Sequence, residues 1–439
     1  MQLPIQSGVR VHKGVFVPSY PENMEHRVED SGVSRGQLVT TRGASTRTQG
    51  PGTDRGGFAF KDQMYRVMGG RLVRVAPDAV ITDLGAIGGI VAARFAQSFD
   101  RLAIAADGRL YLYGTSLTEV TDPDLGQALD VTWLDGYFIT TDGEYIVVTE
   151  LNDPTAIDPL KYGSAEADPD PVTGLLAHRE ELVVFGRYSI QFFQNVGSSG
   201  FPFRAVKGAT IPQGCVSPHA KAKVAGTFAF VGSGKDEPLG LFIAGQGSAT
   251  RVSDNTIDAL LNAEADPSTI SMETRQFGDE QHLIVHLSEC SVALSMRGSQ
   301  EAGDGLWHVL RTGGGAYRPR NAVWCYNRHW VGDVSGSALG VLDNDLTAHF
   351  GQEAGWSFDA GLIYGEGSGM IVSEVRLAGH LPRCHLSMTR DGEIWSMERA
   401  GPGIWRPCTR VRQMCGFRFR GKGRAAIARF DAEIEPLAA

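Results

Sequence analysis

Carboxylates are the first residues whose chemistry can be weighed, because a facing pair of Asp or Glu side chains can act as acid and base in glycoside hydrolysis. Asp135, Asp142 and Glu144 stand close together along the chain. They sit at turns between apolar runs, where Asp is favoured because its side chain bonds to the nearby backbone. We therefore expect these carboxylates to shape turns, and a glycosidase or lyase remains the alternative.

The histidines and cysteines form no signature of a metal site or a nucleophile. His282 and His286 are four residues apart, but their segment HLIVHL has the composition of a strand, which places them about 13 Å apart along it. The sequence contains no HExxH, no Walker loop and no GxGxxG that opens a helix. No two of the six cysteines stand in a CxxC spacing, so free buried thiols are expected. We expect no catalytic residues, no metal and no cofactor.

A basic run near the C-terminus is the clearest candidate for a binding surface. Its members have no acidic residue between them, and they are Arg406, Arg410, Arg412, Arg418, Arg420 and Lys422. Two pairs in this run are spaced two apart, so each pair is expected to project from one face of a strand. Phe417 and Phe419 face the other side, which argues against base stacking. Such a face could bind an acidic protein or a phosphate backbone, and a solvated outer surface is the alternative.

The charge of the chain is unevenly distributed, which supports this interpretation. Residues 370–430 carry 12 Lys and Arg against 4 Asp and Glu, whereas the rest of the chain carries 29 against 46. An acidic body with a basic C-terminal region indicates two surfaces with different partners.

Short hairpins are the elements that must carry these residues. Gly accounts for 55 of 439 residues, as expected of a chain with many turns. Dipeptides that favour tight hairpin turns join several pairs of apolar runs, at Gly69-Gly70, Asp107-Gly108, Asp135-Gly136 and Asp142-Gly143. Strand signals continue over residues 58–342. We predict an all-β protein whose body is a β-propeller of roughly six or seven blades, with a chain of β-sandwiches as the alternative.

Three regions are predicted along the chain. Residues 1–57 form an extended arm that wraps or docks on the body, and a strand that closes a ring of blades is the alternative. Residues 58–350 form the propeller-like body, including one short helix at 252–263 that Ser253 can cap. Residues 351–439 form a C-terminal β-sandwich-like domain, whose clearest hairpin, within residues 385–399, turns at Asp391-Gly392.

Targeting signals are not evident. No stretch approaches the roughly 18 uninterrupted apolar residues of a membrane-spanning helix, and the first residues lack the apolar core of a signal peptide. We expect no membrane insertion, and synthesis and folding in a cytoplasm.

Eight pieces of this sequence, read in order, resemble one family. They are YPENM at 20–24, GVSRG at 32–36, MYRVMGGRL at 64–72, YGSAEADPDPVTGL at 162–175, ELVVFGRYSIQFF at 181–193, METRQFGDEQHLIVHL at 272–287, SMTRDGEIWSMER at 387–399 and RVRQMCGFRFR at 410–420. Their joint order and spacing are similar to those of the packaged-DNA stabilisation proteins of short-tailed phages, the tail-hub or head-completion component.

This resemblance implies a structural virion protein located in the tail. Members form a hexameric ring below the portal and its adaptor ring, help to close the DNA channel after packaging, and present a surface to the tail needle, spikes or fibres. Non-specific contact with packaged DNA is implied as well, as is a propeller-like fold with additional β-structure. The family has no catalytic residues to carry over, so we expect no enzyme. A glycan-binding adhesin acting at the host surface is a further alternative, beside the glycosidase or lyase.

Overall fold

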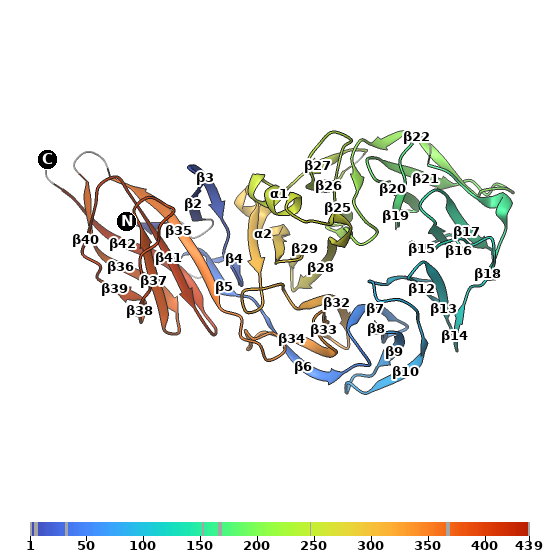
Figure 1. Ribbon diagram of the computed structural model, residues 1–439, viewed down its shortest axis with the longest axis horizontal. Coiled ribbons are helices and arrows are strands. Elements are labelled where there is room, and N and C mark those ends of the chain that lie inside the picture. The colour runs from blue at the N-terminus through green and yellow to red at the C-terminus, as the bar shows by residue number, and fades with distance from the viewer. Residues whose placement is uncertain are drawn as a thin grey trace.

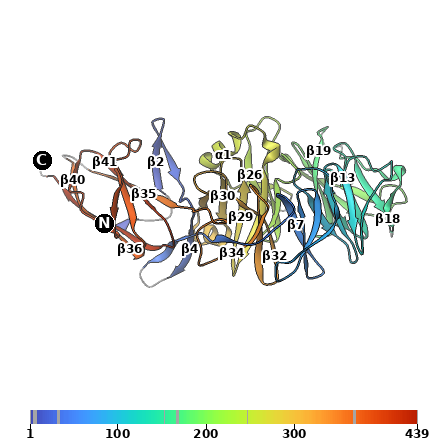
Figure 2. The same cartoon turned by 60° about the horizontal axis from the view of Figure 1, so that its bottom comes forward.

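The computed structural model describes residues 2–3, 8–30, 34–151, 153–165, 169–245, 247–365 and 369–437. A ring of β-sheets and a separate β-lobe lie side by side along the longest axis, with both chain ends at the lobe (Figure 1). The view in Figure 2 shows the same order, from the lobe past β2 and β4 to the ring. No helix among the described residues is long and apolar enough to cross a membrane.

Seven sheets make up the ring within the described residues, so the predicted propeller is confirmed and its blades number seven. Blade 1 comprises β7 (Asp54–Phe60), β8 (Gln63–Met68), β9 (Arg71–Val75) and β10 (Ile81–Ala86). Blade 2 comprises β11 (Arg94–Gln97), β12 (Leu102–Ala106), β13 (Arg109–Tyr113) and β14 (Leu117–Glu119). Blade 3 comprises β15 (Asp130–Leu134), β16 (Tyr137–Thr141), β17 (Ile146–Glu150) and β18 (Asp153–Ile157). Blade 4 comprises β19 (Val172–His178), β20 (Glu181–Gly186), β21 (Ile190–Asn195) and β22 (Phe203–Ile211).

The remaining blades follow in chain order, except for one strand. Blade 5 comprises β23 (Gly214–Cys215), β24 (Lys221–Val224), β25 (Thr227–Ser233), β26 (Gly240–Ala244) and β27 (Ala249–Arg251). Blade 6 comprises β28 (Ser271–Phe277), β29 (Glu280–His286), β30 (Ser291–Ser295) and β31 (Leu306–Leu310). Blade 7 comprises β32 (Pro319–Cys325), β33 (Arg328–Asp333), β34 (Ala338–Asp343) and, from the start of the chain, β6 (Gly43–Gln49).

Two-residue turns explain much of this pattern. Asp107 and Gly108 have φ of 54° and 73°, and Asp135 and Gly136 have φ of 50° and 91°. Positive φ at both central residues defines the turn whose twist matches that of paired strands. The registers run without a break across both hairpins, from β12 to β13 and from β15 to β16.

Strand β6 closes the ring, because it pairs antiparallel with β34 as the outermost strand of blade 7. The segment 1–57 therefore supplies strands to several places. Hairpin β2 (Gly8–His12) and β3 (Val15–Ser19) stands between ring and lobe, while β4 (Met24–Asp30) and β5 (Arg35–Thr40) join the lobe (Figure 1). The closing strand was the alternative prediction for this segment.

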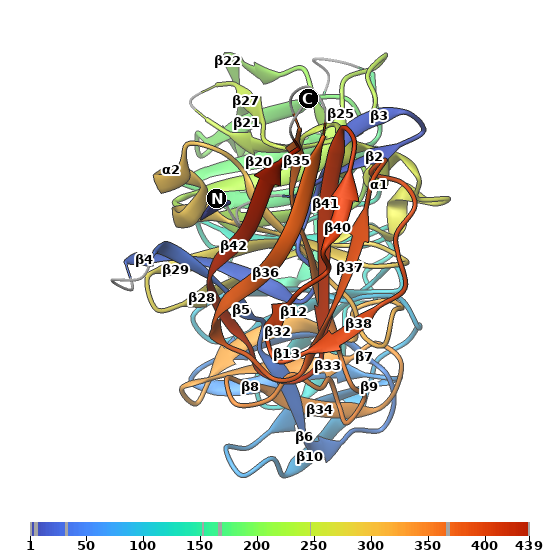
Figure 3. The ribbon, with the colours of Figure 1, turned by 90° about the vertical axis from the view of Figure 1, so that its left-hand side faces the viewer.

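The lobe is a β-sandwich, which confirms the predicted second fold (Figure 3). One sheet contains β1 (Gln2–Leu3), β4, β5, β36 (Met370–His380), β39 (Ile404–Trp405), β40 (Thr409–Val411) and β42 (Ala426–Pro436). The other contains β35 (Trp356–Tyr364), β37 (Cys384–Thr389), β38 (Arg399–Gly401) and β41 (Met414–Gly421). Phe417, Phe419 and Phe430 are buried between them with Trp356 and Trp405.

Two local predictions are wrong. Helix α1 (Asn255–Asn262) is capped by Asp254, whose side chain accepts hydrogen bonds from the amides of Thr256 and Ile257, whereas the Ser253 hydroxyl donates to Asp258 and accepts from the Leu241 amide. The hairpin turn forms at Asp391, but the strand expected at residues 394–399 is mostly missing. The Asp391 side chain accepts bonds from the amides of Glu393 and Ile394, and Trp395 makes only an isolated bridge to Thr389 before β38 pairs with β37. A second helix, α2 (Met296–Ala302), was not predicted.

A buried carboxylate links the inner strands of four consecutive blades. Asp130 of blade 3 lies 2.6 Å from Lys221 Nζ of blade 5 and 3.1 Å from Arg94 Nε of blade 2. It also accepts a 2.8 Å bond from the amide of Leu175 in blade 4. Gly174 makes this approach possible, since a Cβ there would lie 2.6 Å from Lys221 Nζ. The ion pair thus holds the hub of the propeller together.

Candidate functional site at the propeller–sandwich junction

The segment at residues 20–24 connects the two folds through its backbone. The Glu22 amide donates to Ser357 O of β35 at 2.7 Å, and the Asn23 amide donates to Val309 O of β31 at 2.7 Å. The Asn23 side chain donates to Gly355 O and accepts from the amide of Arg311. One piece of chain is therefore bonded to the propeller on one side and to the sandwich on the other, which fixes their relative position.

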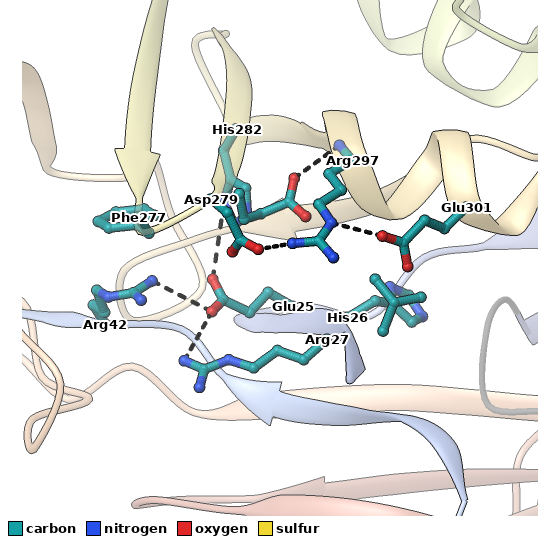
Figure 4. Close-up of a pocket in the computed structure, with 11 residues that line it drawn as sticks. Glu25, His26, Arg27, Arg42, Phe277, Asp279, His282, Arg297 and Glu301 are labelled. Atoms are coloured by element: carbon teal, nitrogen blue, oxygen red, sulfur yellow. Dashed lines mark hydrogen bonds and ion pairs between the residues drawn. The ribbon is translucent and has the colours of Figure 1, made fainter. Parts of the chain in front are cut away.

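A buried charged cluster lies beside this segment (Figure 4). Glu25 of β4 lies 3.3 Å from both Arg27 and Arg42, and the Arg42 guanidinium stands 3.7 Å above the ring of Phe277 in blade 6. These residues line a cavity of about 160 Å³ that extends to α2. A carboxylate at this depth is stabilised only if its charge is compensated, and the two guanidinium groups do this.

Glu25 also approaches two histidines, and together they could offer ligands to a metal. The ligand atoms of Glu25, His282 and His308 lie within 4.8 Å of one another, and all three residues are buried. Burial, together with Arg42 and other nearby guanidinium groups, lowers the pKa of His282 to about 3. Burial likewise lowers the pKa of His308 to about 3, so both rings are neutral near pH 7.

The charges around this trio do not suit a dication. The guanidinium groups of Arg27 and Arg42 already take up the single negative charge of Glu25, so a divalent ion would add to an excess of positive charge in a poorly hydrated place. We interpret the trio as the polar core of the joint between β4 and blade 6. Sequence reasoning missed Glu25 and His308, since they come from segments far apart in the chain.

The histidine pair weighed from the sequence does not converge. His286 bonds to Ser291 and lies 3.3 Å from Glu273, whereas His282 faces Glu25. Glu273 in turn pairs with Arg275. The two histidines therefore belong to different polar groups: His286 to one within blade 6, and His282 to one shared with β4.

Two of the carboxylates weighed from the sequence, Asp135 and Asp142, serve turns. Asp135 has a positive φ in its hairpin turn and accepts a bond from Asn195. Asp142 accepts bonds from the amides of Glu144 and Tyr145. These interactions account for the Asp side chains by turn geometry.

The six basic residues are divided between the two sheets of the sandwich. Arg410 lies on β40, Arg412 follows that strand, and Arg406 follows β39; all three lie at one edge of the larger sheet. Arg418 and Arg420 lie on one face of β41, opposite the buried phenylalanines, and Lys422 follows that strand.

Acidic residues distant in sequence accompany four of the six. Two bonds at 2.6 and 2.9 Å join Arg418 to Asp359. The other pairs are Arg406–Glu374 at 3.0 Å, Arg420–Glu398 at 3.3 Å and Lys422–Glu353 at 2.6 Å. Arg418 and Asp359 are both largely buried. The basic members of the other three pairs are exposed. Partner binding by this face stays a prediction.

Comparisons with known proteins match both folds. The family described as "Bacteriophage P22 Gp10, beta-propeller" matches residues 1–347, and "Bacteriophage P22 Gp10, beta-sandwich" matches residues 355–435. The Tail hub protein gp10 of Salmonella phage P22 is 24% identical over 460 aligned positions, which cover 95% of this chain and 96% of that protein. Among solved structures, the N-terminal domain of Nup159 covers 72% of this chain and 97% of its own, at 10% identity and a TM-score of 0.42. The computationally designed Ika8 protein covers 69% and 99%, at 11% identity and a TM-score of 0.39.

A seven-bladed propeller joined rigidly to a β-sandwich defines a class of two-domain β-protein. Because the two matches cover nearly the whole chain, it belongs to the family of Bacteriophage P22 Gp10. This confirms the family predicted from the eight sequence pieces, the phage tail-hub and packaged-DNA stabilisation proteins.

Proposed function

We propose that this protein is a structural component of a phage tail hub, located in the virion tail. Family membership over both domains carries the proposal, because the P22 relative that spans almost the same length is a tail hub protein. The backbone bonds at residues 20–24 support it, since a part that bears load between neighbours benefits from two domains in fixed relation.

The hub completes the head after DNA packaging and closes the portal channel so that the genome is retained. A hexameric ring suits this task, because six copies make many weak contacts at once and act at high effective concentration. The ring assembles in the host cytoplasm, contacts the portal or adaptor ring, and offers a platform to the tail needle, spikes or fibres. No enzymatic step is part of this role.

The uneven charge assigns the two domains different tasks. The acidic body repels the phosphates of passing DNA, which limits contact with packaged DNA to weak and non-specific encounters. The basic sandwich grips a neighbouring subunit or the adaptor.

Nuclease accessibility of packaged DNA tests the proposal directly. Particles are assembled with and without this protein, and their DNA is exposed to nuclease. The proposal expects packaging to proceed in both cases and DNA to become digestible only without the protein. Protected DNA with a loss of infectivity alone would contradict it, and would point instead to host attachment through an adhesin, glycosidase or lyase.

A further inference from the structure

A cleft lies between the hairpin β2–β3, the first turns of α1, blade 6 and the sandwich strands β35 and β41. It encloses about 390 Å³, and the hairpin that forms one wall stands between the sandwich and α1 in Figure 1. Four arginines line it from three parts of the chain: Arg10, Arg311, Arg418 and Arg420. The fold therefore concentrates positive charge in a concave place next to the junction.

Only part of this charge is neutralised within the cleft. Asp359 holds Arg418 and also accepts a bond from the Ser19 hydroxyl at 2.7 Å. Glu22 lies 3.7 Å from Arg311. Among the described residues Arg10 has no ion pair, and the partner of Arg420, Glu398, does not line the cleft. Four guanidinium groups thus face two carboxylates, which leaves the cleft positive.

Arg418 is held ready for a ligand. Its two bonds to Asp359 use Nε and Nη2, and its guanidinium stacks 3.9 Å above the ring of Trp395. Side chains fixed in this way lose little conformational entropy on binding. By contrast, Arg10 and Arg420 are exposed and can adjust to a partner.

We propose that this cleft binds an extended Asp- and Glu-rich segment of a partner protein. The inference rests on the proposed function, because it assigns a partner chemistry to Arg418 and Arg420 of the basic face. Carboxylates pair with the free guanidinium groups, while amides of the bound backbone donate to the oxygens of Glu22 and Asp359. Val17, Leu260 and Phe358 provide apolar contacts for the stems of the bound side chains.

The same features disfavour a nucleic acid. A phosphodiester chain carries a charge at every nucleotide, and Glu22 and Asp359 would repel it along the cleft wall. A peptide can place its carboxylates only where arginines stand. A volume of about 390 Å³ accepts a few side chains but not a double helix.

A binding titration with the purified full chain tests this inference. The probe is a short fluorescein-labelled peptide that alternates Glu with Ser, and a Gln and Ser peptide of equal length is the neutral control. Fluorescence anisotropy is expected to detect binding of the acidic peptide only, with an affinity that falls as salt is added. The variant R10E/R420E is expected to bind about tenfold more weakly, because two exposed charges in the cleft change sign.

Arg204→Glu is the matched control, since it reverses an exposed arginine on β22 of blade 4, away from the cleft. Thermal unfolding of both variants checks that each is folded. The inference is overturned if the neutral peptide binds as tightly as the acidic one, or if R204E weakens binding as much as R10E/R420E does. It is also overturned if a single-stranded oligonucleotide binds more tightly than the acidic peptide and R10E/R420E weakens that binding too. The titration needs no virion. A titration that detects no binding therefore contradicts only the cleft inference, and the nuclease experiment still tests the tail-hub proposal separately.

Discussion

Replacing Lys221 by Met is expected to destabilise the propeller strongly. The Lys221–Asp130 pair has a 2.6 Å contact and no exposed side-chain surface on either partner. Burial favours the neutral acid, but Lys221 and Arg94 outweigh it and hold the pKa of Asp130 below its ordinary value. The variant leaves a buried carboxylate with Arg94 alone, whose side chain is partly exposed.

The size of the effect follows from this burial. Removing one partner of a buried pair costs roughly 3–5 kcal/mol, and the remaining contact with Arg94 places the loss near the lower end, at about 3 kcal/mol. With a denaturant slope of about 3 kcal/mol/M, the urea midpoint followed by tryptophan fluorescence falls by about 1 M.

Lys161→Met is the matched control. Lys161 makes a contact of the same length, 2.6 Å to Glu150, but both side chains are partly exposed, so the expected loss is below about 1 kcal/mol. Adding Asp130→Asn to the Lys221→Met variant is expected to recover part of the stability, because the uncompensated buried charge disappears. The reasoning is refuted if Lys221→Met and Lys161→Met unfold at the same urea concentration.

Three further predictions concern acid, thiols and the junction. The pKa values of His282 and His308 are about 3 in the folded chain and about 6.5 in the unfolded chain. Between about pH 6.5 and pH 3 the unfolded state therefore binds more protons than the folded state, so the free energy of unfolding falls as the pH drops. Each histidine contributes a loss of roughly 2 kcal/mol between pH 7.5 and pH 5. Urea midpoints at these two pH values measure it, with a smaller drop expected for His308→Gln. Cys408 is exposed and the other five thiols are buried, so a thiol reagent should label one cysteine of the native chain rapidly; fast labelling of several would contradict the structure. Asn23 has a φ of 53° and makes two side-chain bonds. Asn23→Ala is therefore expected to lower the free energy of unfolding by about 3 kcal/mol. Asn23→Gly relieves the backbone strain, so its loss is expected to be about 1 kcal/mol smaller than that of Asn23→Ala. Urea unfolding and protease cleavage at the junction compare the two, and a larger loss for Gly would contradict this account.

Local chemistry made most of the fold predictable. The Asp-Gly turns at residues 107–108 and 135–136 require positive φ, and the apolar runs beside them have the composition of strands, so hairpins could be read directly from the chain. The strand signals over residues 58–342 nearly coincide with the span from β7 to β34. The capping residue of α1 was misjudged because Ser253 and Asp254 can both cap a helix. The bond that the Ser253 hydroxyl accepts from the Leu241 amide of a neighbouring strand decides between them.

The candidate site could be predicted only in part. The arginines of β41 were predicted because basic residues that follow one another closely can be recognised from the sequence alone. Their neighbours Asp359 and Glu398 were not, because these acids stand 59 and 22 residues away from the arginines that they accompany. The same limit hid Glu25 and His308, which approach His282 only after blade 6 and β4 have packed together.

The sequence by itself determined the all-β class, the division into a propeller and a sandwich, and the family, because turn chemistry, strand periodicity and motif order are properties of neighbouring residues. Only the tertiary structure decided the seventh blade, which β6 completes with β34, and the rigid joint at residues 20–24. It also decided which basic residues pair with acidic side chains and which are exposed. These features depend on contacts between segments hundreds of residues apart, and such contacts form only when hydrophobic burial and paired charge together offset the entropy of bringing the segments together.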